Sequence, residues 1–140
     1  MKTAELHKEI DLIQNVITRM SHNSFLIKGW ALSIVGIMLA LLKDSIFTSK
    51  GTLLLCIILV FTITFWYLDA FFLKTEKQYI KLYNWVIMNR QKGNYEKPYD
   101  LNATRFKVGS SFKIMLSKTL WTFYSIPLLI TIGLLIYNVF

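Results

Sequence analysis

One aspartate stands out among the residues that could do chemistry, because it lies inside an apolar stretch. Between Leu53 and Leu73, Asp69 is the only ionisable group apart from Cys56 and Tyr67. A charged side chain at the centre of a membrane span costs about 2.5–3.5 kcal/mol on insertion scales, so it usually has a partner or a function. Asp69 lies about one helical turn before the polar residues resume. It is therefore the first candidate for an intramembrane pairing or functional residue.

Lys28 is the expected partner of Asp69, because it lies about one turn into an earlier apolar stretch, residues 25–42. The two stretches would run antiparallel, which places both side chains at a similar depth. We therefore predict an ion pair or a short hydrogen-bonded network between Lys28 and Asp69. Its expected role is to fix the register and rotation of two helices. The alternatives are a polar point in a conduction or gating path, and an aspartate that merely meets the lipid headgroups.

A second pattern continues from Asp69 along the same helical face. Glu76 and Tyr83 follow it at intervals of seven residues, which is two turns of helix. Arg19 and Lys28, on the preceding segment, are positioned to meet this stripe. We expect salt bridges that lace a helical hairpin together, with a ligand site at the membrane edge as the alternative.

The pattern of reactive residues does not favour an enzyme. His7 and His22 do not have the spacing of a usual metal site. Cys56 is the only cysteine, so no internal disulfide can form, and it reads as a small core hydrophobe. Neither it nor any serine has a base in a recognisable arrangement, and no glycine-rich phosphate loop is present. We expect no catalytic residue, no cofactor and no metal.

The elements that position these residues are predicted to be helices in a bilayer. The chain has 140 residues, of which 54% are hydrophobic and 17% charged, with a mean hydropathy of +0.45. That composition is too apolar for an ordinary soluble domain. Residues 25–42, 53–73 and 119–140 are each close to the roughly 20 apolar residues that a helix needs to span a membrane. We predict one all-α membrane domain with three spans, the first serving as an uncleaved signal anchor.

Two polar helices are predicted beside these spans. Residues 2–20 form an amphipathic helix, and residues 74–91 continue the second span as a helix that ends at Gly93. Glu9 is placed on the polar face of the first helix, and residues 20–24 form a polar joint before the first span. We expect the two helices to pack together, with self-association of protomers as the alternative. Residues 92–118 are predicted to be a basic loop. The apolar seam of the first helix has heptad spacing and consists of Leu6, Ile10, Ile13, Ile17 and Met20.

Small residues mark one face of the first span. Gly29, Ser33, Gly36 and Ala40 recur at spacings of 4, 3 and 4. Such spacing lets two helices approach closely in lipid. We expect this face to meet the second span of the same chain, with a contact between protomers as the alternative.

The positive charge is distributed as expected for a membrane protein. The net charge is +8, and 10 of the 16 Lys and Arg residues lie in residues 73–118, whereas none follows residue 118. Cytoplasmic loops carry such an excess. We therefore predict a multi-pass protein of the bacterial inner membrane, with the N-terminus in the cytoplasm and the C-terminus outside. Nucleic-acid binding is the weaker explanation of the charge, because no reader motif accompanies it, and no nucleic-acid partner is expected.

Five segments of the chain form a recognisable pattern: Arg19-Met20, residues 23–30, residues 65–73 with Glu76, Leu82-Tyr83, and residues 117–120 with Phe123-Tyr124. This pattern resembles that of a group of small bacterial membrane proteins of poorly described function. The order of helix, two spans and long helix is also similar to the SLATT type of two-span domain. That resemblance implies nucleotide-signalled or phage-triggered defence and a membrane pore. The third span departs from the plan, and no fused sensor is seen, so a trigger would come from a separate protein.

Three functions are compatible with these features. The first is an oligomeric effector that permeabilises or depolarises the inner membrane in anti-phage defence, with the lipid bilayer, further copies of the chain and a cytoplasmic protein as partners. The second is a membrane anchor or small subunit that docks a cytoplasmic enzyme or sensor through residues 74–118. The third is a holin-like lysis protein, which the topology and the lack of a charged C-terminal tail disfavour.

Overall fold

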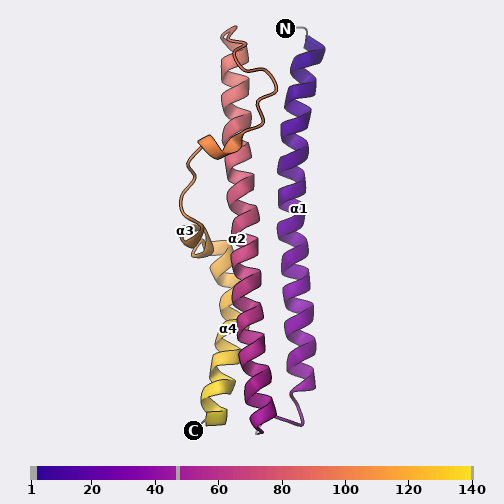
Figure 1. Cartoon of the computed structure of the whole chain (residues 1–140), viewed down its shortest axis with the longest axis vertical. Helices are drawn as coiled ribbons and strands as arrows, with labels where there is room; N and C mark the ends of the chain where they lie inside the picture. The colour runs from indigo at the N-terminus through magenta and orange to yellow at the C-terminus, as the bar shows by residue number, and fades with distance from the viewer. Residues whose placement is uncertain (1–2, 47, 140) are drawn as a thin grey trace.

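The computed structural model describes residues 3–46 and 48–139, and all regular structure in that part of the chain is helical. Three long helices, α1 (Thr3–Leu41), α2 (Ser49–Gln91) and α4 (Lys118–Val139), lie along one axis (Figure 1). The short helices η1 (Ala103–Arg105) and α3 (Ser111–Met115) lie between α2 and α4 along the chain. The expected all-α class is confirmed.

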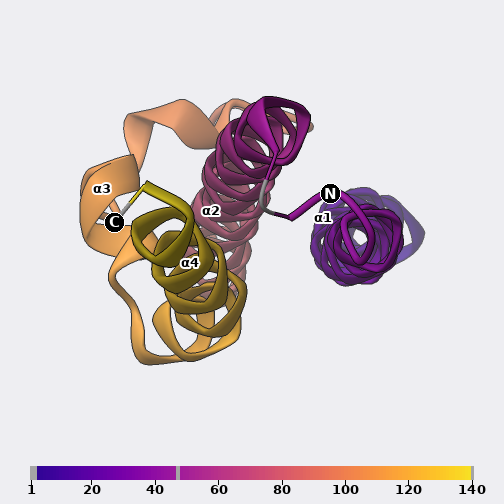
Figure 2. The same cartoon turned by 90° about the horizontal axis from the view of Figure 1, so that it is seen from below.

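The long helices are long and apolar enough to cross a membrane three times. An apolar window meeting this criterion occurs in each of α1, α2 and α4. Helix α2 packs against both α1 and α4, and the view along the axis shows it between them (Figure 2). The described chain starts and finishes at opposite ends of the molecule (Figure 1), as three successive crossings require. The chain is thus a helical membrane protein of three candidate spans.

Helix α1 is continuous through the segment where a polar joint was expected. Residues 20–24 are helical like their neighbours. Serine and asparagine are weak helix formers in isolation, because their side chains compete for the backbone. Here Ser24 is buried against α2 instead, so tertiary contacts override the local preference. The prediction of a joint was wrong.

Helix α2 continues without a break from the second span into its polar part, residues 74–91, which we call the extension. It begins after Thr48, whose side chain accepts a hydrogen bond from the Gly51 amide at 3.2 Å. A side chain at position 51 would clash, because an added Cβ would lie 2.1 Å from the Ser45 carbonyl oxygen. The helix ends at Gln91, and Gly93 follows with a φ of +74°. Glycine adopts this left-handed conformation without strain, which suits the end of a helix.

The segment between α2 and α4 is more ordered than a simple loop. It contains η1 and α3, and both pack against α2. Ser110 caps α3 by accepting a hydrogen bond from the Lys113 amide at 3.2 Å. The Trp66 indole N–H donates to the Met115 carbonyl at 3.0 Å, which ties α3 to the second span. The prediction of a loop over residues 92–118 missed these short helices, because their stabilising contacts are far away in the sequence.

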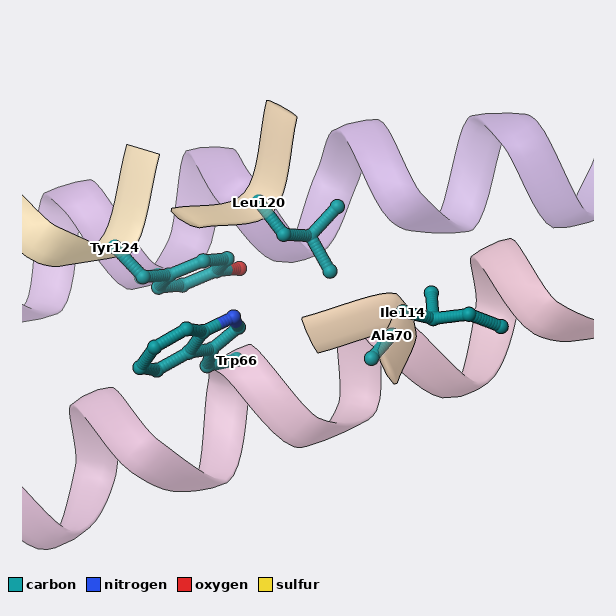
Figure 3. Packing of buried hydrophobic residues seen from close by; sticks show 6 residues of the cluster. Trp66, Ala70, Ile114, Leu120 and Tyr124 are labelled. Carbon is teal, nitrogen blue, oxygen red and sulfur yellow. The ribbon is translucent and has the colours of Figure 1, made fainter. Parts of the chain in front are cut away.

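The buried apolar residues form three clusters spaced along the helices. The first lies in the polar extension, around Ile13 and Leu82. The second lies where α3 and α4 meet α2, around Trp66 and Tyr124, and includes Ala70, Ile114 and Leu120 (Figure 3). The third lies near the turn between α1 and α2, around Leu42 and Leu55. The core is therefore a seam that runs the whole length of α2.

The small-residue face of α1 does not take part in this core. The buried residues of the first span are Ile27, Ala31, Val35 and Leu42. The expected packing of the small residues against the second span is therefore wrong. The face offers too little apolar area to compete with the larger side chains next to it for burial. The four exposed positions are Gly29, Ser33, Gly36 and Ala40.

Candidate functional site

Lys28 and Asp69 meet at the inner face of α1 and α2. The Lys28 Nζ lies 2.6 Å from Asp69 Oδ2. The Asp69 side chain is fully buried, whereas that of Lys28 keeps 22% of its surface exposed. A buried carboxylate is stable only when its charge is paired and its oxygens accept hydrogen bonds. The structure thus brings together the two residues that were expected to pair.

Two further side chains complete the coordination of Asp69. The Ser24 hydroxyl donates to Asp69 Oδ1 and itself accepts from Lys28 Nζ at 2.8 Å. The Tyr124 hydroxyl donates to Asp69 Oδ2 at 3.2 Å. Both carboxylate oxygens are thereby satisfied. The four residues, which we call the polar cluster, connect all three long helices.

Sequence reasoning missed Ser24 and Tyr124 as members of the polar cluster. Ser24 precedes Lys28 by four residues, so it shares its helical face. That spacing was a usable signal. Tyr124 carries no comparable signal, because only the tertiary arrangement shows that α4 approaches Asp69.

Aromatic rings shield the polar cluster from one side. The Trp66 and Tyr124 rings are stacked with centroids 6.0 Å apart (Figure 3). The centroid of the Trp121 ring lies 5.6 Å from that of Trp66. Leu120 and Ala70 pack beside them and are fully buried. Because apolar surroundings strengthen a charge pair, this packing makes the Lys28–Asp69 contact harder to break.

Glu76 and Tyr83, which follow Asp69 on the same face of α2, are not joined to α1 by salt bridges in the described chain. Ion pairs within residues 3–46 and 48–139 join Lys28 to Asp69, Glu9 to Arg90 and Asp100 to Arg105, so Glu76 has none. The Tyr83 hydroxyl accepts a weak hydrogen bond of 3.4 Å from Gln14 Nε2. Arg19, expected to meet the stripe, is exposed. The lacing hypothesis was wrong for these positions, because Glu76 and Arg19 do not come within pairing distance.

Glu76 has a perturbed acidity. Desolvation by burial raises the pKa of its carboxyl above the ordinary value of 4.5, while the positive charges of Lys77 and Lys28 oppose that increase. Glu76 lies beyond Leu73, outside the apolar part of α2. It is thus a half-buried acid near the polar cluster, at the start of the extension.

A second buried ion pair fastens the far end of the extension. Arg90 donates from Nη2 to Glu9 Oε1 at 2.9 Å and from Nε to Oε2 at 3.1 Å, and both side chains are 1% exposed. The Tyr99 amide also donates to Glu9 Oε1 at 3.0 Å. Arg90 further donates to the carbonyls of Asn94 and Glu96. This bidentate pair joins α1, α2 and the following loop.

The expected place of Glu9 on the solvated face of α1 was wrong. Glu9 lies four residues before Ile13 and seven before Val16. It therefore shares the buried stripe, and this spacing could have revealed it. Its pairing with Arg90 carries no sequence signal, because the two residues are 81 positions apart.

The arrangement holds charged and polar side chains in fixed positions. Among the described residues, no group of three His, Cys, Asp or Glu side chains could hold a metal ion. The polar cluster contains a hydroxyl, a phenol, an ammonium and a carboxylate, all engaged with one another. Chemically it can bind a charge, lock helices or release them when the pair is broken.

Comparisons with protein-family models, with curated proteins and with solved structures found no match to this chain. Its function is therefore inferred from the geometry of the helices and their surfaces.

Proposed function

We propose that this protein is an oligomeric membrane effector that permeabilises or depolarises the bacterial inner membrane when a cytoplasmic partner signals, in defence against phage. In this proposal the N-terminus and the extension lie in the cytoplasm and the C-terminus lies outside. The excess of basic residues between the second and third spans supports that orientation.

The observation that carries the proposal is the unused small-residue face of α1. Gly29, Ser33, Gly36 and Ala40 are exposed along the length of the first span. A Cβ added at Gly29 or Gly36 would meet no atom within 4 Å. In lipid, helices associate through such small residues because their backbones can approach closely. The face is therefore available to another copy of the chain.

The polar cluster has a supporting role in this proposal. Asp69 is fully buried and its partners come from the same chain, so it does not face an oligomer interface. It holds α1 at one rotation relative to α2, which keeps the small-residue face outward. A cytoplasmic signal that moves the extension would be transmitted along α2, which is one continuous helix, to the polar cluster, and would thereby act on assembly.

The test combines oligomer state with membrane potential. We compare the chain with Gly29→Leu, because Gly29 does not line the groove between α1 and α4. Gly133→Leu in α4 is the matched control, because Gly133 is also exposed with no atom near an added Cβ. Cross-linking in membranes should show oligomers for the wild type and the control, and at least tenfold fewer for Gly29→Leu. A voltage-sensitive dye should report depolarisation only where oligomers form. A wild type that stays monomeric in membranes would contradict the proposal.

A second candidate is a membrane anchor that docks a cytoplasmic protein. Exposed lysines line the extension and the segment that follows, which favours an acidic partner surface. Replacing them by glutamine should abolish co-purification of such a partner while leaving any ion leak unchanged. If the leak is lost instead, the anchor hypothesis fails. The lysines concerned are Lys77, Lys81, Lys92, Lys97, Lys107 and Lys113.

A further inference from the structure

A groove of about 740 Å³ separates α1 from α4 in the apolar part of the molecule. Thr62 of α2 contributes to its lining, and the hydroxyl of that residue is bonded to the Ile58 carbonyl of its own helix. The surface that the groove presents is therefore almost wholly apolar. Its walls include Ala31, Val35 and Gly36 on α1, and Ile126, Pro127 and Ile130 on α4.

The length of the groove matches one leaflet of a bilayer. Its lining extends from Lys28 to Leu39 on α1 and from Lys118 to Ile130 on α4. At 1.5 Å per residue these segments measure about 16–18 Å. Half of a hydrocarbon core is about 15 Å thick. The groove therefore begins near one headgroup layer and ends near the bilayer midplane.

Positive charge gathers at the polar mouth of the groove. Lys28 and Lys118 both line it, and the charge of Lys28 is offset by Asp69, whereas Lys118 is exposed and forms no ion pair among the described residues. Helix α4 begins at Lys118, so the positive end of its dipole lies at the same mouth. The buried Ser117 hydroxyl has no hydrogen-bond partner in the described chain and so does not cap α4. Lys118 and the N-terminal end of α4 thus place positive charge at the mouth.

The cross-section of the groove distinguishes between two occupants. A volume of 740 Å³ over about 17 Å gives a mean cross-section of about 44 Å². A helix that is about 10 Å across has a cross-section of about 80 Å², so a span of a second copy would enter the groove only in part. Acyl chains are thinner and flexible, and an anionic headgroup would supply a counter-charge for Lys118.

We propose that this groove binds one anionic phospholipid from the leaflet on the side of the extension. Its acyl chains lie between α1 and α4, and its phosphate lies at the mouth beside Lys118 and the first turn of α4. The site uses α4 and the inward edge of α1, and it does not depend on the proposed effector function.

The experiment is native mass spectrometry of the full chain released from vesicles of phosphatidylcholine and phosphatidylglycerol in equal amounts. The wild type should retain one phosphatidylglycerol per protomer. Lys118→Ala should lower the preference for phosphatidylglycerol about fivefold, as expected for the loss of one lysine at an anionic surface. Lys113→Ala removes a nearby exposed lysine that does not line the groove, and should leave the preference unchanged.

A second pair of variants tests the apolar part of the groove. Ile126→Trp fills the groove and should lower the amount of retained lipid at least tenfold. Leu129→Trp changes an exposed position outside the groove and should leave that amount unchanged. Circular dichroism verifies that every variant keeps its helix content. The proposal is overturned if no lipid is retained, if all variants retain it equally, or if Ile126→Trp instead abolishes a lipid-free dimer.

Discussion

Asp69 shows how a single carboxylate can organise a membrane-embedded core. Its oxygens accept from Ser24 and Tyr124 and face the Lys28 ammonium. A buried carboxylate with fewer partners would destabilise the fold, because its charge would lie uncompensated among apolar side chains. The residue therefore depends on three helices being in place, and in turn it selects one arrangement of them.

Removing the Asp69 charge should leave Lys28 without a partner. We expect Asp69→Leu to lower the free energy of unfolding by about 3 kcal/mol, because an uncompensated charge remains beside an apolar core. The double variant Asp69→Leu/Lys28→Leu should recover part of this loss, since no lone charge is left. Unfolding in mixed micelles, followed by circular dichroism, measures both. Asp44→Leu in the exposed turn is the control, and a loss no larger than its own would refute the prediction.

Glu76 should make stability depend weakly on pH. Burial raises the pKa of Glu76 in the folded state above the unfolded value of 4.5. The stabilising contribution of its protonated form to the free energy of unfolding is therefore fully present below pH 4.5, and it is lost as the pH rises through the folded-state pKa. Glu76→Gln should therefore be more stable than the wild type at pH 7, by less than about 1 kcal/mol because Glu76 is only partly buried and solvent screens its charge. The difference should vanish near pH 4 in thermal unfolding curves, and a constant difference across this range would contradict it.

At the level of elements, α1 and α2 are locked together at two points. Glu9 and Lys28 are separated by nineteen residues on α1, and Asp69 and Arg90 by twenty-one on α2. At 1.5 Å per residue the two spacings are about 28 Å and 32 Å. Side chains are long enough to compensate for the small difference between these spacings. Both pairs can form together only if each helix is unbroken. This requirement explains the continuity of α1 through residues 20–24.

The Glu9–Arg90 pair should control the local stability of the extension. We expect Glu9→Gln to destabilise it by about 3 kcal/mol, because Arg90 is left buried without its counter-charge. Amide hydrogen exchange of the extension (residues 74–91), and of residues 4–18 of α1 that pack along it, should accelerate accordingly. Asp100→Asn makes the same chemical change in the exposed Asp100–Arg105 pair, which contributes only about 0–1 kcal/mol. Equal acceleration in both variants would show that burial of the pair is unimportant.

The whole molecule has one central helix, and the other two long helices pack on it (Figure 2). Two surfaces follow from this arrangement. One is the outward small-residue face of α1, and the other is the groove between α1 and α4. The first suits a further copy of the chain and the second suits a lipid, and the two surfaces meet at Gly36, which belongs to both.

Three spans and an asymmetric charge predict the orientation of the whole molecule. A periplasm-dependent alkaline phosphatase fused after residue 139 should be active in bacterial cells. The same enzyme inserted after Asn94, in the basic segment, should be at least tenfold less active, because basic segments are retained in the cytoplasm. A cytoplasm-dependent reporter at the same two positions provides the control. The opposite pattern of activities would reverse the proposed topology.

The sequence alone determined the class of this protein and part of its candidate site. Apolar runs of about 20 residues are decisive because a helix is the simplest way to satisfy the backbone in lipid. The Lys28–Asp69 pair was predictable too, because charges within such runs are rare and two antiparallel helices place side chains of equal depth next to each other. The continuation of α2 beyond the span followed from its helical spacing.

The tertiary structure decided which faces are buried and which distant residues meet. It turned the small-residue face of α1 outward, placed Glu9 against Arg90 and brought Tyr124 to Asp69. Periodicity defines a face but not its neighbour, because a face can pack against any helix of suitable shape. The rotation of each helix is set by the sum of many contacts along α2, and these depend on all three helices at once.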